Sequence, residues 1–306
     1  MKRTTSAIAL VAASILGLTA CGGGSDPLTP ETTESATGGA GGGEPIVVGG
    51  ANFSESTLLA EIYAGALRAK GVEASTKLNI GSREIYLRAL EDNSVQVFPE
   101  YTGALALYYD NAFTGTDADE VYAHVQKVLP DTLVVLDKSA AEDNDSIVVT
   151  SETATANNLK TIEDLKAIAG DLALAAPPEF KERPQGIPGL EATYGVVFGS
   201  FRPLTGQGIV QALKNGQVGA ANIFSTDPAI AANGFVALED TKRLFGSQNI
   251  VPLVRADRAE EVEEALNAVS AKLTTESIAE MLKKTDIDKA DPKTVAEEFL
   301  TTNGLG

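Results

Sequence analysis

Histidine, cysteine and basic side chains are scarce in this sequence of 306 residues. It contains one histidine, one cysteine and no tryptophan, and 24 Lys and Arg side chains stand against 42 Asp and Glu side chains. A single cysteine excludes a disulfide within the chain, and one histidine with one cysteine argues against an ordinary zinc site. The net charge of −18 argues against nucleic acid or an anionic membrane surface as a partner, because both attract basic patches. We therefore expect no metal and no cofactor.

The first twenty residues combine a basic start with a short apolar stretch. Lys2 and Arg3 precede a run from Ala7 to Ala20, which predicts a secretory signal peptide over residues 1–20, too short to span a bilayer permanently. The run ends in Leu18-Thr19-Ala20-Cys21-Gly22, which resembles the lipobox of bacterial lipoproteins. That resemblance implies cleavage before Cys21 and attachment of lipid to its sulfur. The alternative is a free thiol.

Residues 21–44 have the composition of a tether. They are mostly Gly, Ser, Thr, Pro, Glu and Ala, with no apolar periodicity, which is typical of a flexible linker. The remaining length of about 260 residues is enough for a large core and two lobes.

Strands and helices alternate from the start of this remainder. A β-branched run at 46–48 closes in two glycines and leads to a helix, for which Ser54 is the predicted N-cap. A strand from Ala74 to Ile80 and a second helix ending at Leu90 follow. This alternation predicts an α/β fold with parallel strands.

The stretch from Phe98 to Gly103 places an acid, an aromatic ring and a hydroxyl at a strand end. We expect the strand Ser94 to Phe98 to stop at Pro99, which lacks an N–H for the ladder, and ligands in open α/β sheets bind outside such carboxyl ends. A helix, turn and strand ending at Phe224 repeat the layout with the same spacing that leads to Tyr101. The repeat is either an ordinary α/β unit or two lobes that each present one ring to a shared cleft.

The second half of the chain continues the alternation. The strand Ser146 to Thr150 is the predicted first crossover, and strands at 235–238 and 250–254 are predicted to return to the first lobe. An apolar stripe from Val262 to Leu273 at helical spacing predicts core packing. These elements predict lobe I over 45–146 and 240–306, and lobe II over 147–239.

Five short motifs occur in an order that resembles one protein family. They are Gly50-Ala51-Asn52-Phe53-Ser54-Glu55, Gly81-Ser82-Arg83-Glu84, Pro99-Glu100-Tyr101-Thr102-Gly103, Ser225-Thr226-Asp227-Pro228 and Leu238-Glu239-Asp240. Together they resemble the substrate-binding lipoproteins of ABC importers for glycine betaine, choline, carnitine and related osmoprotectants. The resemblance implies a type II periplasmic-binding-protein fold, with two lobes joined by two crossover strands. It also implies a monomer, held by lipid at the outer face of the cytoplasmic membrane, that passes a small solute to permease subunits.

The resemblance also implies a set of ligand-binding residues. These are Asn52, Ser54, Ser82, Arg83, Glu100, Tyr101, Asp145, Phe224, Thr226, Asp227 and Gln248.

The aromatic residues depart from the family pattern, which surrounds a quaternary ammonium with several tyrosines. Tyr101 matches one of them and Phe224 stands in for another, whereas Asp145 and Gln248 occupy two further positions of that cage. Two rings at about 0.5–2 kcal/mol each do not reach the roughly 8 kcal/mol of micromolar affinity. Charge must therefore contribute.

Two sets of charged residues are available for that contribution. Asp145, Glu100 or Asp227 would attract a cation, and Arg83 with the helix end at Ser54 would attract a carboxylate. Structural roles compete with this: Glu100 would only brace the turn, and Asp227 would only start the next helix or turn.

Three functions compete at this point. The leading one is a receptor for an osmoprotectant, and the second is a receptor for another small polar solute, such as an amino acid derivative. The third is a tethered enzyme. Cys21 and His124 offer no nucleophilic triad, although Glu100 and Asp227 would suit acid–base work. We expect a binding protein without enzymatic activity.

Overall fold

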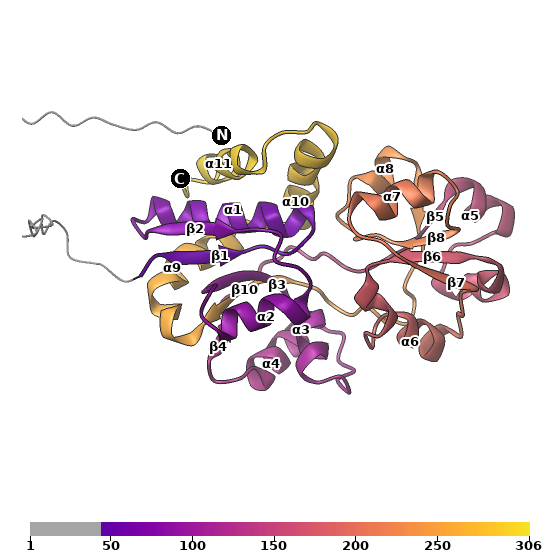
Figure 1. The fold of residues 1–306 in the computed structure, drawn as a ribbon, viewed down its shortest axis with the longest axis horizontal. Coiled ribbons are helices and arrows are strands. Elements are labelled where there is room, and N and C mark those ends of the chain that lie inside the picture. The colour runs from indigo at the N-terminus through magenta and orange to yellow at the C-terminus, as the bar shows by residue number, and fades with distance from the viewer. Residues whose placement is uncertain (1–43) are drawn as a thin grey trace, which may run out of the picture. The chain divides into compact units, whose positions relative to one another are not determined.

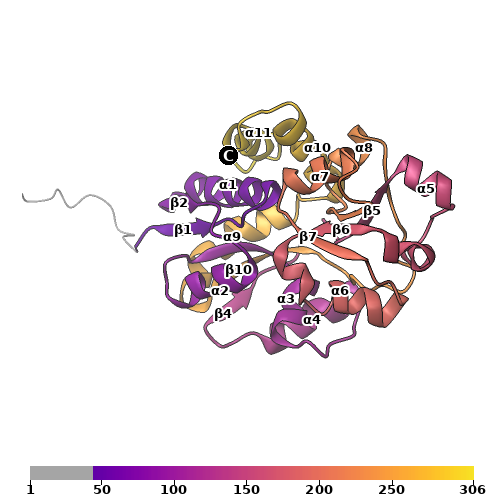
Figure 2. The same ribbon diagram turned by 45° about the vertical axis from the view of Figure 1, so that its right-hand side comes forward.

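The computed structural model describes residues 44–306; the predicted signal peptide, Cys21 and nearly all of the predicted tether lie outside the described residues. Two five-stranded sheets form the framework of the described part (Figures 1 and 2). In spatial order, the first consists of β2 (Ala74–Lys77), β1 (Ile46–Gly49), β3 (Val97–Tyr101), β10 (Ile250–Arg255) and β4 (Leu133–Val135). The second consists of β7 (Ser200–Pro203), β6 (Ala173–Ala176), β8 (Ala220–Asn222), β5 (Ile147–Thr150) and β9 (Phe235–Ala237).

The two sheets share one topology. Three parallel strands are followed in space by one antiparallel strand, which is β10 in the first sheet and β5 in the second. In both cases this is the strand that the chain forms directly after crossing from the other sheet. The chain crosses between β4 and β5 and returns between β9 and β10, and the two connections touch at a bridge between Glu142 and Asn249. The predicted α/β fold with two crossover segments is confirmed.

Helices cover both faces of each sheet. On the first sheet, α1 (Ser54–Ala69), α9 (Ala259–Ser270), α10 (Thr275–Leu282) and α11 (Pro292–Thr302) share one core. The other face packs against α2 (Arg83–Glu91), α3 (Thr102–Tyr109) and α4 (Ala118–Val128) (Figure 1). On the second sheet, α7 (Gln207–Lys214) and α8 (Ala229–Ala232) cover one face, and α5 (Ser151–Asn157) packs on the other, with α6 (Ile187–Gly189) in the chain segment that adjoins that core.

Short turns of 3₁₀ and π helix complete the described part. They lie at Ile162–Ala167, Ala169–Asp171, Pro178–Lys181, Leu190–Tyr194, Ala256–Arg258 and Lys283–Ile287. None of the helices over 44–306 has the length and hydropathy that a membrane crossing needs.

Burial on both faces explains the sequence pattern. Strands that are covered on two sides are almost continuously apolar, as in β10, where all residues but the last are buried. The apolar stripe from Val262 to Leu273 lies in the core shared with α1, as predicted. We call the first sheet with its helices lobe I and the second sheet with its helices lobe II. The predicted limits of lobe II at 147 and 239 stay a prediction.

Two predicted features of the strands were wrong. Pro99 does not end its strand but lies in the middle of β3, paired in register with Pro252 of β10. Neither residue of this pair has an N–H to lose, and β1 pairs with β3 only at Val97, so both prolines fit where no ladder donor is required. The strand at 235–237 does not return to lobe I, because it pairs with β5 in the second sheet.

Local corrections concern element ends. Ser54 is the first residue of α1 and not its N-cap; Phe53 holds that position and makes no capping bond with its side chain. Instead the Ser56 hydroxyl accepts a hydrogen bond from the Ala51 N–H at 2.8 Å. The strand predicted over 74–80 ends at Lys77.

Candidate functional site

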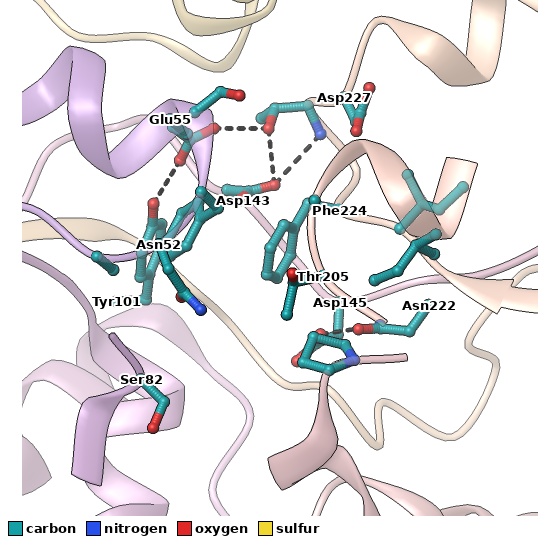
Figure 3. Close-up of a pocket in the computed structure, with 18 of the residues that line it drawn as sticks. Asn52, Glu55, Ser82, Tyr101, Asp143, Asp145, Thr205, Asn222, Phe224 and Asp227 are labelled. Atoms are coloured by element: carbon teal, nitrogen blue, oxygen red, sulfur yellow. Dashed lines mark hydrogen bonds between the residues drawn. The ribbon is translucent and has the colours of Figure 1, made fainter. Parts of the chain in front are cut away.

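A cavity lies between the two lobes, where loops leave the carboxyl ends of the parallel strands (Figure 3). Most of its lining comes from the segments that follow β1, β2 and β3 in lobe I and β6, β7 and β8 in lobe II, and from the two crossovers. This is where ligands bind in open α/β sheets. Ten of the predicted ligand-binding residues line it, namely Asn52, Ser54, Ser82, Arg83, Tyr101, Asp145, Phe224, Thr226, Asp227 and Gln248. Glu100 is fully buried behind the lining.

Three aromatic rings meet in the cavity. Phe53 lies between the other two, with its ring centroid 6.2 Å from that of Tyr101 and 5.4 Å from that of Phe224. Phe53 is not one of the two rings predicted from sequence, because its residue type and its neighbours do not distinguish it from a core residue. Its position after a strand end, like that of Tyr101, was the available signal. The cavity therefore has more aromatic surface than the sequence indicated.

The buried acid Glu100 holds Arg83 in place. Arg83 donates from Nε and Nη2 to the two carboxylate oxygens of Glu100 at 2.8 and 2.9 Å, and Tyr86 donates its hydroxyl at 2.6 Å. Glu100 also accepts the backbone N–H of Tyr101 at 2.7 Å. Burial by itself would lower the pKa of the Arg83 guanidinium. The charge of Glu100 has the larger effect, and the pKa is raised. Glu100 thus braces the strand end and positions Arg83, which lines the cavity.

A hydroxyl from lobe II joins two buried carboxyl groups. Thr226 Oγ1 lies 2.6 Å from Glu55 Oε2 on α1 and 2.8 Å from Asp143 Oδ1 in the first crossover (Figure 3). Tyr101 donates its hydroxyl to the other oxygen of Glu55 at 2.7 Å. The Thr226 hydroxyl has one proton, so it donates to one carboxyl group only. The second contact is a hydrogen bond if the other carboxyl group is protonated and donates to Oγ1.

The pKa shifts agree with a proton held between these two acids. Burial raises the pKa of Glu55 above its ordinary value of 4.5, although hydrogen bonds from Thr226 and Tyr101 oppose the shift. Burial and the nearby Glu55 charge raise the pKa of Asp143 well above 3.8. Ionising both carboxyl groups would place two negative charges next to one hydroxyl, which costs free energy. The pair therefore holds a proton more tightly than either acid alone.

Two further acids face the cavity, Asp145 from the first crossover and Asp227 from lobe II. Asp145 accepts one hydrogen bond from Asn222 Nδ2 at 2.9 Å, and burial raises the pKa of Asp145. Asp227 accepts the N–H of Ala229 at 2.8 Å, so it begins the α8 turn and also lines the cavity. Burial raises the pKa of Asp227 as well.

The backbone of lobe I approaches the return crossover closely beside Tyr101. A Cβ at Gly103 would lie 2.5 Å from the Ser247 carbonyl oxygen and 2.9 Å from the Gln248 amide nitrogen. Gln248 is 2% exposed; it accepts the N–H of Ala104 at 2.9 Å and donates to the Phe245 carbonyl at 3.0 Å. Glycine is thus required at 103, and the Gln248 amide supports the site more than it faces it.

A second contact between the lobes is ionic. Arg183 of lobe II donates to Glu84 of α2 through Nε at 3.2 Å and Nη2 at 3.2 Å, and it lies 3.8 Å from Glu179. Burial opposes ionisation of Glu84, but hydrogen bonds from Ser82 and the Arg183 charge leave its pKa lowered. The sequence offered no sign that this arginine contacts lobe I.

Among residues 44–306, no group of three or more His, Cys, Asp and Glu is placed to hold a metal ion.

These features are those of a binding site and define a class. Two α/β lobes of one topology, joined by two crossovers around a cavity lined by rings and acids, form a two-lobed substrate-binding protein. Residues 44–302 match the family described as the substrate binding domain of ABC-type glycine betaine transport systems. The chain belongs to this family, as its motifs predicted. Members are substrate-binding proteins of ABC importers and not enzymes; such proteins bind small solutes and work with permeases.

Individual relatives agree with the assignment. The chain is 27% identical to the glycine betaine-binding protein YehZ of Escherichia coli over 85% of this chain and 91% of the relative. It is 24% identical to the carnitine transport binding protein OpuCC of Listeria monocytogenes over 85% and 87%. Among solved structures, a glycine betaine/carnitine/choline ABC transporter protein superposes with a TM-score of 0.68 at 22% identity, covering 85% of this chain and 99% of the other.

Proposed function

We propose that this protein is an extracytoplasmic receptor that binds an osmoprotectant in the cavity between its lobes and delivers it to an ABC permease. Glycine betaine, choline and carnitine are the candidate solutes. The observation that supports this most is the meeting of three rings, from Phe53, Tyr101 and Phe224, beside buried carboxyl groups. A methylated ammonium has no proton to donate, so ring faces and negative charge are what attract it.

The third ring increases the binding free energy expected from the aromatic residues. Three rings at about 0.5–2 kcal/mol each contribute about 1.5–6 kcal/mol, against the roughly 8 kcal/mol of micromolar binding. The acids of the cavity supply the remainder through charge. We propose that Asn52, Ser54, Ser82, Asp145 and Asp227 contact the solute together with the rings, whereas Glu100 acts through Arg83 and Tyr101.

The proposed location is based on the sequence of the N-terminal segment. We propose that Cys21 carries lipid after removal of residues 1–20, and that 21–44 tether the receptor to the outer face of the cytoplasmic membrane. The support is the lipobox resemblance and the family membership, because permeases receive solute from that side. We propose a monomer, since one chain supplies both sides of the cavity.

A receptor for another small polar solute is the second candidate. Asp145 and Gln248 stand where the family pattern has rings, and the hydrogen-bonding pair Asp145 and Asn222 lines the cavity. Such groups suit a solute with more hydrogen-bond donors, such as an amino acid derivative.

A ligand panel tests the proposal and separates the two candidates. We would titrate the purified protein by calorimetry with glycine betaine, choline, carnitine, ectoine and proline betaine, and follow melting in parallel. A solute at about 100 times its Kd stabilises the folded state by about 2.7 kcal/mol, which raises the melting temperature by about 5–10 °C at this size. We expect binding of at least one methylated ammonium. Binding of ectoine alone would favour the second candidate, and no binding in the whole panel would contradict the proposal.

A further inference from the structure

The charge balance of the cavity is strongly negative. Six carboxyl side chains and two guanidinium groups line it, and no lysine or histidine does. The acids are Glu55, Asp143, Asp145, Glu179, Asp227 and Asp286, and the bases are Arg83 and Arg183. Even with one proton held between Glu55 and Asp143, acids outnumber bases.

Both bases are already neutralised by the protein. Arg83 makes its two-bonded pair with the fully buried Glu100. Arg183 lies between Glu84 and Glu179, at 3.2 and 3.8 Å. A solute carboxylate brought to either guanidinium would also meet the acid that the guanidinium binds, and like charges at such distances repel.

Asp145 has a single hydrogen-bonding partner among the described residues. Among the described residues its carboxylate accepts only the Asn222 bond, through Oδ1, and no arginine or lysine forms a salt bridge with it. It lines the cavity together with Phe224 and Thr205 (Figure 3). Its second oxygen is therefore available to a donor on the solute, and a charge-assisted bond there would be of the strong kind.

We propose that the cavity takes a small organic cation of net positive charge, with an O–H or N–H donor directed at Asp145, in preference to a zwitterion that carries a carboxylate. This rests on the proposed function, because it chooses among the solutes of the same cavity. Asp145 is then the residue that determines specificity, and the rings hold the ammonium end, which is common to both solute types.

Choline and glycine betaine are a matched pair of probes. They share the trimethylammonium group, and one ends in a hydroxyl where the other ends in a carboxylate. We would titrate both into the wild type, Asp145→Asn and Asp137→Asn by calorimetry. Asn at 145 keeps an oxygen for the Asn222 bond and removes the charge. Asp137 is exposed and lies outside the cavity lining, so its variant controls for overall charge.

We expect the wild type to bind choline about tenfold or more tightly than glycine betaine, and Asp145→Asn to lose about tenfold or more of the choline affinity. Its glycine betaine affinity should change by less than about threefold, because no bond to that solute is removed. Asp137→Asn should behave as the wild type. Glycine betaine binding as tightly as choline, or an unchanged choline affinity in Asp145→Asn, would overturn the inference and leave the proposed function standing. Binding of neither probe nor any other solute of the panel would overturn both.

Discussion

Removing the Thr226 hydroxyl tests whether the lobes are held together at Glu55. Glu55 lies in lobe I and Thr226 in lobe II. The contact of 2.6 Å between Thr226 Oγ1 and Glu55 Oε2 therefore exists only when the lobes meet. Thr226→Val keeps the shape of the side chain and deletes this bond. A hydrogen bond to a charged group is worth about 1.5–3 kcal/mol, which corresponds to about 10- to 150-fold in affinity if the closed form is the one that binds.

The loss should be larger than that of an ordinary bond for a second reason. Without the hydroxyl, Glu55 and Asp143 lose the group that bridges them, and each remains buried at 3% exposure. Glu55 keeps the Tyr101 hydroxyl on Oε1 and Asp143 keeps the Thr226 N–H, but Glu55 Oε2 is left without a donor. A buried polar atom without a partner costs about 1–3 kcal/mol, so we expect the upper half of the range.

The assay is calorimetric titration with the tightest solute of the panel. Thr226→Ser serves as the control, because it keeps the hydroxyl and should retain the affinity within about threefold. If Thr226→Val binds as the wild type does while its circular dichroism is unchanged, the contact between the lobes contributes nothing to binding and the reasoning fails.

Three further predictions follow from the same site. Tyr101→Ala should weaken binding by about 1–3 kcal/mol through loss of ring and buried area, and Tyr108→Ala, an exposed tyrosine, should not; equal affinities by calorimetry would remove the ring from the site. Because the pKa of Glu55 is raised in the closed form, closure takes up a proton, so affinity should fall as the pH rises above the ordinary value of 4.5 for this carboxyl group. Glu55→Gln should make the affinity less dependent on pH. A wild-type affinity that rises with pH would contradict the predicted direction of the change. Cys21→Ala should shift the protein from the membrane fraction to soluble or unprocessed forms on immunoblots, and continued lipidation would exclude Cys21 as the anchor.

Short-range patterns accounted for much of the fold. Glycines after β1, the acid, ring and hydroxyl at the end of β3 and the apolar stripe of α9 each act within a few residues, so the alternation of elements and the family were accessible from sequence. The strand through Pro99 was not, because its fit depends on Pro252, a partner that is distant in sequence.

In the candidate site, single residues could be predicted from the sequence, but the contacts between them could not. Tyr101 and Phe224 were found because both stand at strand ends, and Arg83 and Glu100 were both singled out. Their pairing with each other was not foreseen, since it joins α2 to β3 through side chains. The bridge from Glu55 to Thr226 spans 171 positions, and no local pattern indicates which acid meets which hydroxyl across two lobes.

The two polar contacts between the lobes described above, Glu84 with Arg183 and Glu55 with Thr226, differ in how they respond to salt outside the cell. Glu84 and Arg183 are 42% and 24% exposed, so ions screen their attraction, whereas the buried hydroxyl contact at Glu55 is shielded from them. They also lie on opposite faces of the first sheet, through α2 and α1. In concentrated salt the receptor should therefore loosen along its α2 side first and release solute there. We expect stopped-flow dissociation rates to rise with salt by up to about fivefold in the wild type and to be insensitive to salt in Arg183→Gln; an equal rise in both would show that this side does not govern escape.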